Sequence, residues 1–405
     1  MDRIIYLGEY FDSLLLDNVI KTSKGSINLS GQNFETSLIG GLSQVDPNII
    51  TVVSAPGVGS YPQYNTNLFT KRNLSYVNGI TVNSVGFCNL IGVKRSSRKI
   101  SMYRTLNKII KQEDGDIHFL VVTPIKEFLE VCHFFKRKEK NRKIDITLIL
   151  LDIPSDISSM VRMSKVKRLW IKNKQDKARK LASKCDKAIV LTHAMREYFL
   201  SPIDCIVMEG LFDVDRIKDF PHKVYKTDKK VILYTGTLRS IYGVMNLINA
   251  FEMGDDNKTE LWICGNGDAK DAIINKSASN NRIKYLGLVN SKEALKLQVQ
   301  ATVLVNPRTS EGDYTKYSFP SKTIEYLLSG TPVVMNKLPG IPNEYYPYLI
   351  FPADESIEAL SKAIFDVVHM NEEELEFIGT RGRSFIINNK NATSQAKRVI
   401  DFIKS

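Results

Sequence analysis

The chain has 405 residues, 43% of them hydrophobic and 25% charged, an ordinary composition for a soluble globular protein with enough length for two cores. No apolar run approaches the length that spans a bilayer, and the first residues are too acidic for a signal peptide, so we expect a cytoplasmic protein. The five cysteines include no Cys-x-x-Cys pair, which argues against a zinc site or a disulfide framework.

The positive charge is concentrated in the first half. Residues 1–210 hold 31 lysines and arginines against 20 acidic residues, whereas the rest of the chain holds 25 against 24. Residues 160–187 alone carry 11 basic and two acidic residues, interleaved with apolar ones. This composition is typical of a segment on an anionic membrane surface, although a nucleic-acid surface or a solvated helix face carries similar charge.

The first half alternates short apolar runs with helical patterns. The apolar runs predict strands at residues 3–7, 49–53, 80–85, 117–122, 146–151, 188–191 and 205–208. The helical patterns fall at residues 34–42, 102–111, 125–138, 173–183 and 194–200. Continuous apolar strands separated by helices indicate a parallel, doubly wound sheet.

Ligands gather at the carboxyl ends of the strands in such a sheet. The stretch 8–32 follows the first strand, and we expect it to line a cleft. Asp152 follows the strand at 146–151 and is our candidate to meet a substrate hydroxyl, with a turn or helix cap as the alternative.

A linker is predicted at 210–229, where glycine, proline and charged residues show no periodicity. The alternation then restarts, with strands at 231–235, 260–264, 283–286, 302–305, 332–335 and 349–351 and helices at 243–251, 269–276, 292–300, 321–328 and 357–368. We therefore assign a first domain at 1–209, a second at 230–385 and a final helical segment at 386–405.

The stretch 306–325 carries the clearest functional signal. It connects an apolar strand to a helix that begins after Pro320, with Ser321 as the expected N-cap. A helix start at this place directs N–H groups and the positive end of the dipole at an anion. Lys322 opposes that dipole unless a phosphate lies between them, and Glu325 can accept two hydrogen bonds from a diol such as ribose. A capped surface helix with a solvated lysine and glutamate is the alternative.

The sequence Pro-Ser-Lys-Thr-Ile-Glu-Tyr-Leu-Leu-Ser-Gly-Thr-Pro-Val-Val at 320–334 resembles the donor-site signature of glycosyltransferase family 4. The resemblance continues through Tyr-Thr-Gly-Thr-Leu at 234–238 and Leu-Trp-Ile-Cys-Gly-Asn-Gly at 261–267, and it is closest to bacterial members that build capsular and exopolysaccharides. It implies the GT-B fold, in which two doubly wound Rossmann-like domains face a central cleft and the last helix commonly crosses back onto the first domain.

The resemblance also implies roles for individual residues. It places the donor diphosphate near Gly236, Thr237, Arg239 and Lys322, with the ribose at Glu325. Further candidates come from the loop before the helix: Arg308 and Lys316 as added positive charge, the backbone around Tyr317, Ser318 and Pro320 as the sugar site, and Ser321 at the phosphate.

Two positions depart from the family pattern. The first glutamate of the family motif falls on Tyr317, and Glu311 is the candidate to replace it. The lysine that often follows the arginine of the first loop falls near Tyr242, and Lys322 is the candidate substitute. Arg239, Lys322, Glu311 and Asp152 are therefore the predicted catalytic residues.

The implied activity is retaining transfer of a sugar from a nucleotide sugar, expected to be UDP-linked, to a lipid-diphosphate-linked saccharide in surface polysaccharide synthesis. We expect no cofactor and no metal. We also expect no nucleic-acid partner, because a lipid-linked acceptor favours contact of residues 160–187 with the inner face of the cell membrane. A nucleotide-sugar 2-epimerase and a degenerate membrane-bound binding subunit remain the alternatives. A dehydrogenase is disfavoured, because no Gly-x-Gly-x-x-Gly follows a strand.

Overall fold

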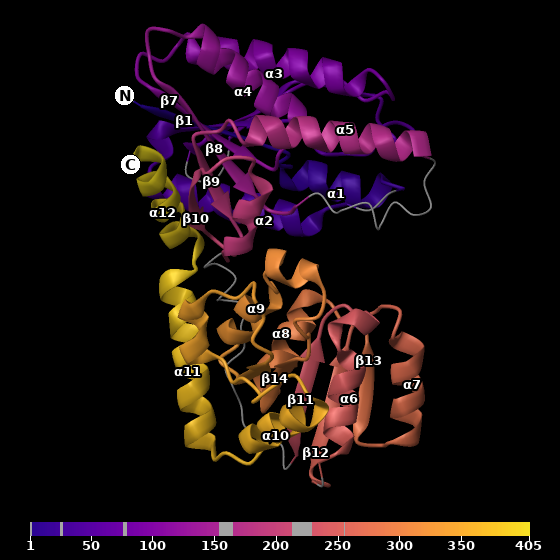
Figure 1. The fold of residues 1–405 in the computed structure, drawn as a ribbon. Coiled ribbons are helices and arrows are strands. Elements are labelled where there is room, and N and C mark those ends of the chain that lie inside the picture. Colours follow the sequence, from indigo (N-terminus) through magenta and orange to yellow (C-terminus); the bar gives the residue numbers. More distant parts are fainter. Residues whose placement is uncertain (1, 25–26, 76–78, 154–164, 213–228, 255) are drawn as a thin grey trace. The chain divides into compact units, whose positions relative to one another are not determined.

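The structure is a computed structural model, and it describes residues 2–24, 27–75, 79–153, 165–212, 229–254 and 256–405. The chain forms two compact units, one of Met1–Leu211 with Ala392–Ser405 and one of Phe212–Asn391 (Figure 1). Each unit is built around one large sheet, and each is described by itself.

The first unit contains an eight-stranded sheet in the order β10-β9-β8-β7-β1-β2-β5-β4. All neighbours are parallel except β4 and β5. The strands are β1 (Arg3–Gly8), β2 (Ile50–Ser54), β4 (Arg72–Ser75), β5 (Thr81–Ser84), β7 (Ile117–Val122), β8 (Ile144–Leu150), β9 (Lys187–Val190) and β10 (Asp204–Val207), with β3 (Leu68–Phe69) and β6 (Phe87–Cys88) in a separate antiparallel pair. The central strands β1 and β7 are buried almost throughout, as their continuous apolar sequences predict.

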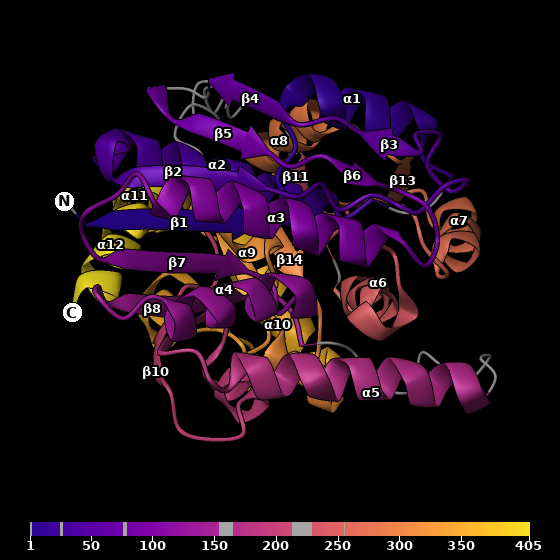
Figure 2. The ribbon, with the colours of Figure 1, turned by 90° about the horizontal axis from the view of Figure 1, so that it is seen from above.

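Helices cover both faces of this sheet (Figures 1 and 2). They are α1 (Ser13–Thr22), α2 (Leu29–Val45), α3 (Lys94–Ile110), α4 (Lys126–Lys138), α5 (Lys165–Ala182) and α12 (Ala392–Lys404), with the 3-10 helices η1 (Pro47–Ile49) and η4 (His193–Tyr198). Helices α3, α4 and α5 lie on one face, while α2 and α12 pack together on the other. A Cβ on Gly41 would lie 2.1 Å from the Ala392 carbonyl oxygen, so glycine allows α2 and α12 to approach.

The stretch 8–32, expected to line a cleft, contains α1 and the start of α2, and Asp12 caps α1 by accepting a 2.9 Å hydrogen bond from Leu15 N. Two other local expectations for this unit are corrected. The segment at 194–200 is a 3-10 helix, η4. The edge strand β4 runs antiparallel to β5, a pairing that the parallel scheme did not include.

The second unit contains a five-stranded, fully parallel sheet in the order β13-β12-β11-β14-β15. Its strands are β11 (Lys230–Thr235), β12 (Thr259–Cys264), β13 (Ile283–Gly287), β14 (Val303–Asn306) and β15 (Val333–Met335). Its helices are α6 (Val244–Glu252), α7 (Lys270–Ser279), α8 (Ser291–Gln300), α9 (Lys322–Leu328), α10 (Ile357–Val368) and α11 (Glu372–Asn389), with η6 (Ser240–Tyr242), η7 (Asp313–Tyr317) and η8 (Asn343–Tyr348).

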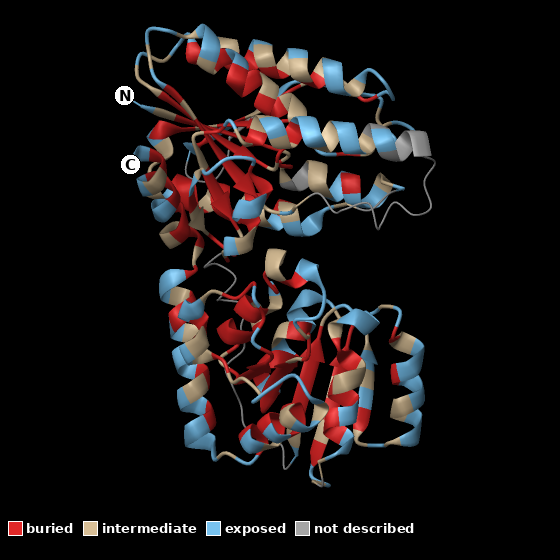
Figure 3. Ribbon diagram, viewed as in Figure 1, coloured by how far each residue is buried: buried red, intermediate tan, exposed pale blue. Residues whose placement is uncertain are grey.

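Two apolar clusters pack on opposite faces of the second sheet, and the buried strands form the centre of the unit (Figure 3). Residues 349–351, predicted as a strand, form only an isolated bridge between Ile350 and Val334. The final predicted segment, 386–405, contains the end of α11 and all of α12, and α12 belongs to the first unit.

Candidate active site

The order of the second sheet sets the place of the site. The chain runs from β11 outward through β12 to β13, then returns to add β14 and β15 on the other side of β11. The strand order therefore reverses between β11 and β14, and loops at the carboxyl ends of the two strands flank this point. The first loop carries Gly236, Thr237 and Arg239, and the second carries Arg308 and Glu311.

The first loop is fixed by the neighbouring β12 loop. Gly236 N donates to Cys264 O at 3.0 Å, and Leu238 N donates to Asn266 O at 2.9 Å. Both of these N–H groups are therefore already paired. The N–H groups of Thr237 and Arg239 have no partner among the described residues, so they are backbone donors that this loop leaves available.

Two arginines meet at Tyr242, from different loops. The Arg239 guanidinium lies 5.6 Å from the centroid of the Tyr242 ring, and the Arg308 guanidinium lies 5.3 Å from the same centroid. A second ring, Tyr314, lies 4.7 Å from the Arg308 guanidinium. Tyr242 thus brings the cations of both loops together at the point where the strand order reverses.

Arg308 is a buried cation with no ion-pair partner in the described part of the chain. Only 7% of the residue is exposed, and its Nε has no hydrogen-bond partner among the residues that the structure describes. A buried guanidinium normally pairs with a carboxylate or satisfies its donors, because desolvating an unpaired charge is costly. The Arg308 guanidinium contacts two aromatic rings and no carboxylate of the described residues, so an anion would complete its environment.

Helix α9 is attached to the end of β11 by Tyr326. The Tyr326 hydroxyl donates to Thr235 O at 3.0 Å and accepts from Thr235 N at 2.9 Å, and burial raises the pKa of this hydroxyl. Ile324, Leu327 and Leu328 are buried on the same helix, as its apolar stripe predicts. Ser321 occupies the N-cap position, as predicted, but its side chain makes no capping hydrogen bond.

Lys322 and Glu325 form part of a hydrogen-bond network behind the first loop. Lys322 Nζ lies 2.8 Å from Glu325 Oε1, and Gln298 of α8 donates to the same oxygen at 2.6 Å. Gln298 also donates to Thr235 Oγ1 at 2.9 Å. Burial raises the pKa of the Cys264 thiol to about 11, and the positive charge of Lys322 opposes this rise. The network orients Glu325 and accounts for Lys322 without a ligand.

The remaining predicted residues occupy the loop between β14 and α9. Glu311 is exposed and next to Gly312, whose φ is 90°. Lys316 and Tyr317 end η7, with the Lys316 ammonium 4.8 Å from the Tyr317 ring centroid. Pro320 is buried and Ser318 half-buried before α9. Asp152 lies exposed beyond β8, in the first unit.

Metal ligands were not expected. Across the described ranges, no three His, Cys, Asp or Glu side chains converge in a way that could hold a metal ion. Metal independence stays a prediction.

Residues 229–369, which hold β11 and β14 and both loops, match the family model for glycosyl transferases group 1. This segment is a group 1 glycosyltransferase domain. The predicted glycosyltransferase activity and family resemblance are confirmed at the level of this domain. No curated protein sequence matches the chain.

The group 1 domain and the first unit together match solved structures over nearly their whole length. Sucrose-phosphate synthase from Thermosynechococcus elongatus is 13% identical, with 99% of this chain and 98% of that chain covered and a TM-score of 0.61. The Escherichia coli trehalose-6-phosphate structure bound with UDP-2-fluoro glucose is 12% identical, with coverages of 100% and 99% and a TM-score of 0.63. Anabaena HepE in complex with UDP is 13% identical, with both coverages 99% and a TM-score of 0.63. These likenesses confirm the predicted GT-B fold.

Sequence reasoning missed two residues of this glycosyltransferase domain, Gln298 and Tyr326. Gln298 shares one face of α8 with the buried residues Ala294, Leu297 and Ala301, and a polar side chain on a core-facing stripe is a signal for a specific hydrogen-bond role. Tyr326 lies beside the apolar stripe of α9, where its hydroxyl needs a buried partner.

Proposed function

We propose that the protein is a retaining glycosyltransferase that moves a sugar from a nucleotide sugar to a lipid-linked saccharide in surface polysaccharide synthesis. The observation that carries this proposal is Arg308, a buried and unpaired cation at the switch point of a glycosyl transferases group 1 domain. Its environment favours a dianionic ligand over a neutral one.

The donor diphosphate gains negative charge as the glycosidic bond breaks. Cations fixed before the reaction then stabilise the transition state more than the ground state. Arg239 and Arg308 are held on either side of the reversal point by their contacts with Tyr242. The Thr237 N–H adds a donor from the first loop, and Lys322 adds charge from the start of α9.

Arg308 supplies the cation that the family pattern places near Tyr242. The sequence makes Lys322 the candidate for this substitution, but Lys322 is held by Glu325. Arg308 instead lies over the Tyr242 ring, and no carboxylate of the described residues forms an ion pair with it. In this proposal Tyr242 positions the two arginines, and Lys322 orients Glu325 toward the ribose.

The family mechanism needs no enzymic nucleophile, because the departing phosphate accepts the acceptor's proton on the same face. Asp152 is the proposed contact for the acceptor hydroxyl, and Glu311 and the backbone around Tyr317 are the proposed contacts for the sugar. The exposure of Glu311 and Asp152 leaves both carboxylates accessible to substrates.

The lipid-linked acceptor places the enzyme at a membrane surface. Within the described part of the chain, no helix is long and apolar enough to cross a bilayer. The basic stretch 160–187 includes α5, where Leu169, Lys172, Lys177 and Lys180 are all exposed. Residues 160–164 lie outside the described residues. High salt should weaken vesicle binding through this stretch, because it screens exposed charges.

Product analysis tests the proposal. A thermal-shift screen with UDP, GDP, dTDP and ADP identifies the nucleotide, since a ligand that binds only the folded state raises its stability. The matching sugar nucleotides are then incubated with bacterial lipid-linked acceptors. We expect free nucleoside diphosphate and an extended lipid with the anomeric configuration retained. Epimerised donor without acceptor would instead identify a 2-epimerase, and donor binding without turnover a binding subunit.

A further inference from the structure

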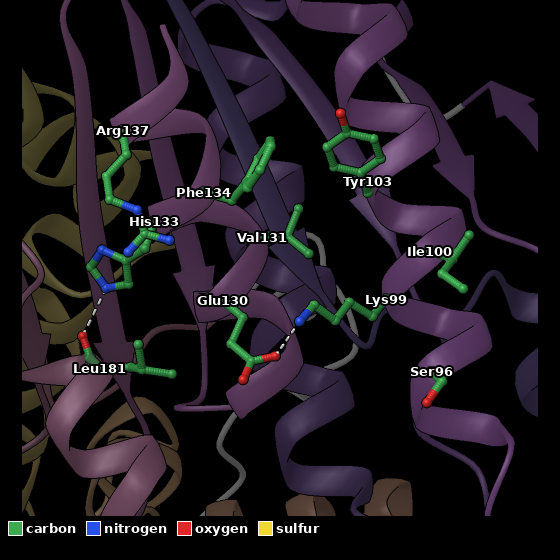
Figure 4. A pocket seen from close by; sticks show the side chains of 10 residues that line it. All are labelled: Ser96, Lys99, Ile100, Tyr103, Glu130, Val131, His133, Phe134, Arg137 and Leu181. Atoms are coloured by element: carbon green, nitrogen blue, oxygen red, sulfur yellow. Dashed lines mark hydrogen bonds and ion pairs between the residues drawn. The ribbon is translucent and has the colours of Figure 1, made fainter.

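A groove of about 580 Å³ lies between α3 and α4 on the outer face of the first unit. Figure 4 shows Ile100 and Tyr103 along α3, and Val131, Phe134 and Arg137 along α4. Lys99 reaches across the groove toward Glu130, at 2.6 Å. The groove combines an apolar lining with cations at its margins, and none of its residues belongs to the proposed donor site.

The aromatic side chains of the lining pack against one another, and part of the lining is open to solvent. Tyr103 stacks on Phe135 with ring centroids 5.3 Å apart, and it meets Phe134 edge-on at 5.2 Å. Phe134 is 39% exposed and Ile100 is 51% exposed. Two large apolar side chains exposed beside an aromatic floor form a surface that gains free energy by leaving water.

Further exposed apolar side chains lie in the turn directly before α3. Ile91 is 77% exposed, and its neighbours Leu90 and Val93 are also exposed. The buried Asn89 side chain fixes this turn by donating to Gly59 O and Thr66 O, both at 2.9 Å. The apolar side chains are therefore held outward by an anchored turn.

The charge around this surface is strongly positive. Helix α3 carries six lysines and arginines and no acidic residue, and α4 carries four against two. Both α4 carboxylates are already paired, Glu127 with Arg95 and Glu130 with Lys99 and Lys126. Arg104 and Arg137 have no ion-pair partner among the described residues. These cations are available to an external anion.

The geometry points to an anionic lipid site: the groove between α3 and α4 takes a lipid of a negatively charged bilayer, with Ile91 and its neighbours in the interfacial layer. Exposed aliphatic side chains beside unpaired cations match the apolar and anionic parts of such a lipid. Nucleic acid would use the cations but leave Ile91 and Ile100 unpartnered. This inference rests on the proposed function only in placing the acceptor at a bilayer. Of the residues that line the groove, Leu181 alone belongs to the stretch 160–187.

Vesicle partitioning of the full chain tests the site. Phosphatidylcholine vesicles with and without phosphatidylglycerol are compared for the wild type, Ile91→Ser/Ile100→Ser and Arg104→Glu/Arg137→Glu. Each double variant should bind the anionic vesicles at least about tenfold more weakly, with an unchanged thermal midpoint because the altered side chains are exposed or at the surface. The matched controls Leu288→Ser and Lys292→Glu change exposed residues of the second unit and should bind as the wild type does.

The groove itself is tested with Phe134→Trp. Phosphatidylglycerol vesicles with brominated acyl chains should quench its added fluorescence, measured against the wild type, and should not quench that of Leu288→Trp. Wild-type partitioning in both double variants, no quenching at position 134, or equal binding to neutral vesicles would overturn the inference. Nucleotide-dependent thermal shifts on the same samples test the donor site separately, so failure of the proposed function is recognised independently.

Discussion

Gln298 Nε2 donates a 2.6 Å hydrogen bond to Glu325 Oε1, and this bond fixes the carboxylate proposed to hold the ribose. Lys322 binds the same oxygen, so Oε2 remains the one with no partner among the described residues. Gln298 is fully buried and also binds Thr235 at the end of β11. The orientation of Glu325 is therefore tied to the strand that carries the first loop.

Glu325→Gln should weaken nucleotide binding by roughly ten- to a hundredfold, because hydrogen bonds to a charged acceptor are stronger than those to a neutral amide. The measurement is calorimetric titration with the nucleotide found in the thermal-shift screen. Glu293→Gln, an exposed carboxylate on α8, is the control and should leave the affinity unchanged. Equal affinities for wild type and Glu325→Gln would remove Glu325 from the site.

Arg308→Met should lower kcat/KM roughly ten- to a thousandfold and leave the thermal midpoint unchanged or higher. The catalytic loss follows from removing a preorganised cation, and the unchanged stability follows from removing a buried charge that has no ion pair. Arg282→Met is the matched control, because Arg282 also lies over a ring, 4.9 Å from the Phe251 centroid, but donates 2.7 Å to Asp256 O. That control should lose stability and keep nucleotide affinity. A destabilised Arg308→Met with normal kinetics would assign Arg308 a structural role.

Asp152→Asn should raise the KM for the acceptor, and the affinity for the nucleotide should stay the same, because Asp152 belongs to the first unit and the donor loops to the second. Losing one charged hydrogen bond predicts an effect of about tenfold or more. Initial rates at varied acceptor concentration separate the two parameters. A change confined to donor affinity would contradict the assignment.

Glu35 should make stability depend on pH. Its carboxyl is buried, and burial together with the nearby negative charge of Glu9 raises its pKa from 4.5 to about 8. The folded protein therefore holds a proton that the unfolded chain releases, so this contribution is complete below about pH 4.5 and is lost as the pH rises to about 8. The slope is at most about 1.4 kcal/mol per pH unit for one proton.

Glu35→Gln should lack this component, because the amide stays neutral. Its oxygen can accept from Glu9 N, and its NH2 group can donate to the Tyr6 hydroxyl, which exchanges the direction of that bond. Thermal midpoints of variant and wild type should thus diverge between pH 5 and 8, with the variant the less affected by rising pH. Glu376→Gln, an exposed position on α11, should follow the wild type. Parallel curves for Glu35→Gln and the wild type would rule out a proton held at Glu35.

The sequence by itself determined the order of elements around the donor loops, because each depends on neighbours along the chain. The apolar run before Asn306 predicts β14, and the stripe of Ile324, Leu327 and Leu328 predicts α9. Local signals also existed for α1, where Asp12 precedes an apolar run, although the periodicity analysis missed that helix.

Only the tertiary structure decided which of these groups are available to a ligand. Three features join segments that are distant in sequence. They are the pairing of the Gly236 and Leu238 N–H groups, the contact of Arg308 with Tyr242 and the hydrogen bond of Gln298 to Glu325. The placement of α12 on α2 is of the same kind. Spacing along the chain fixes the period of a strand or helix, whereas the partner of a buried polar group depends on which segments the fold brings together.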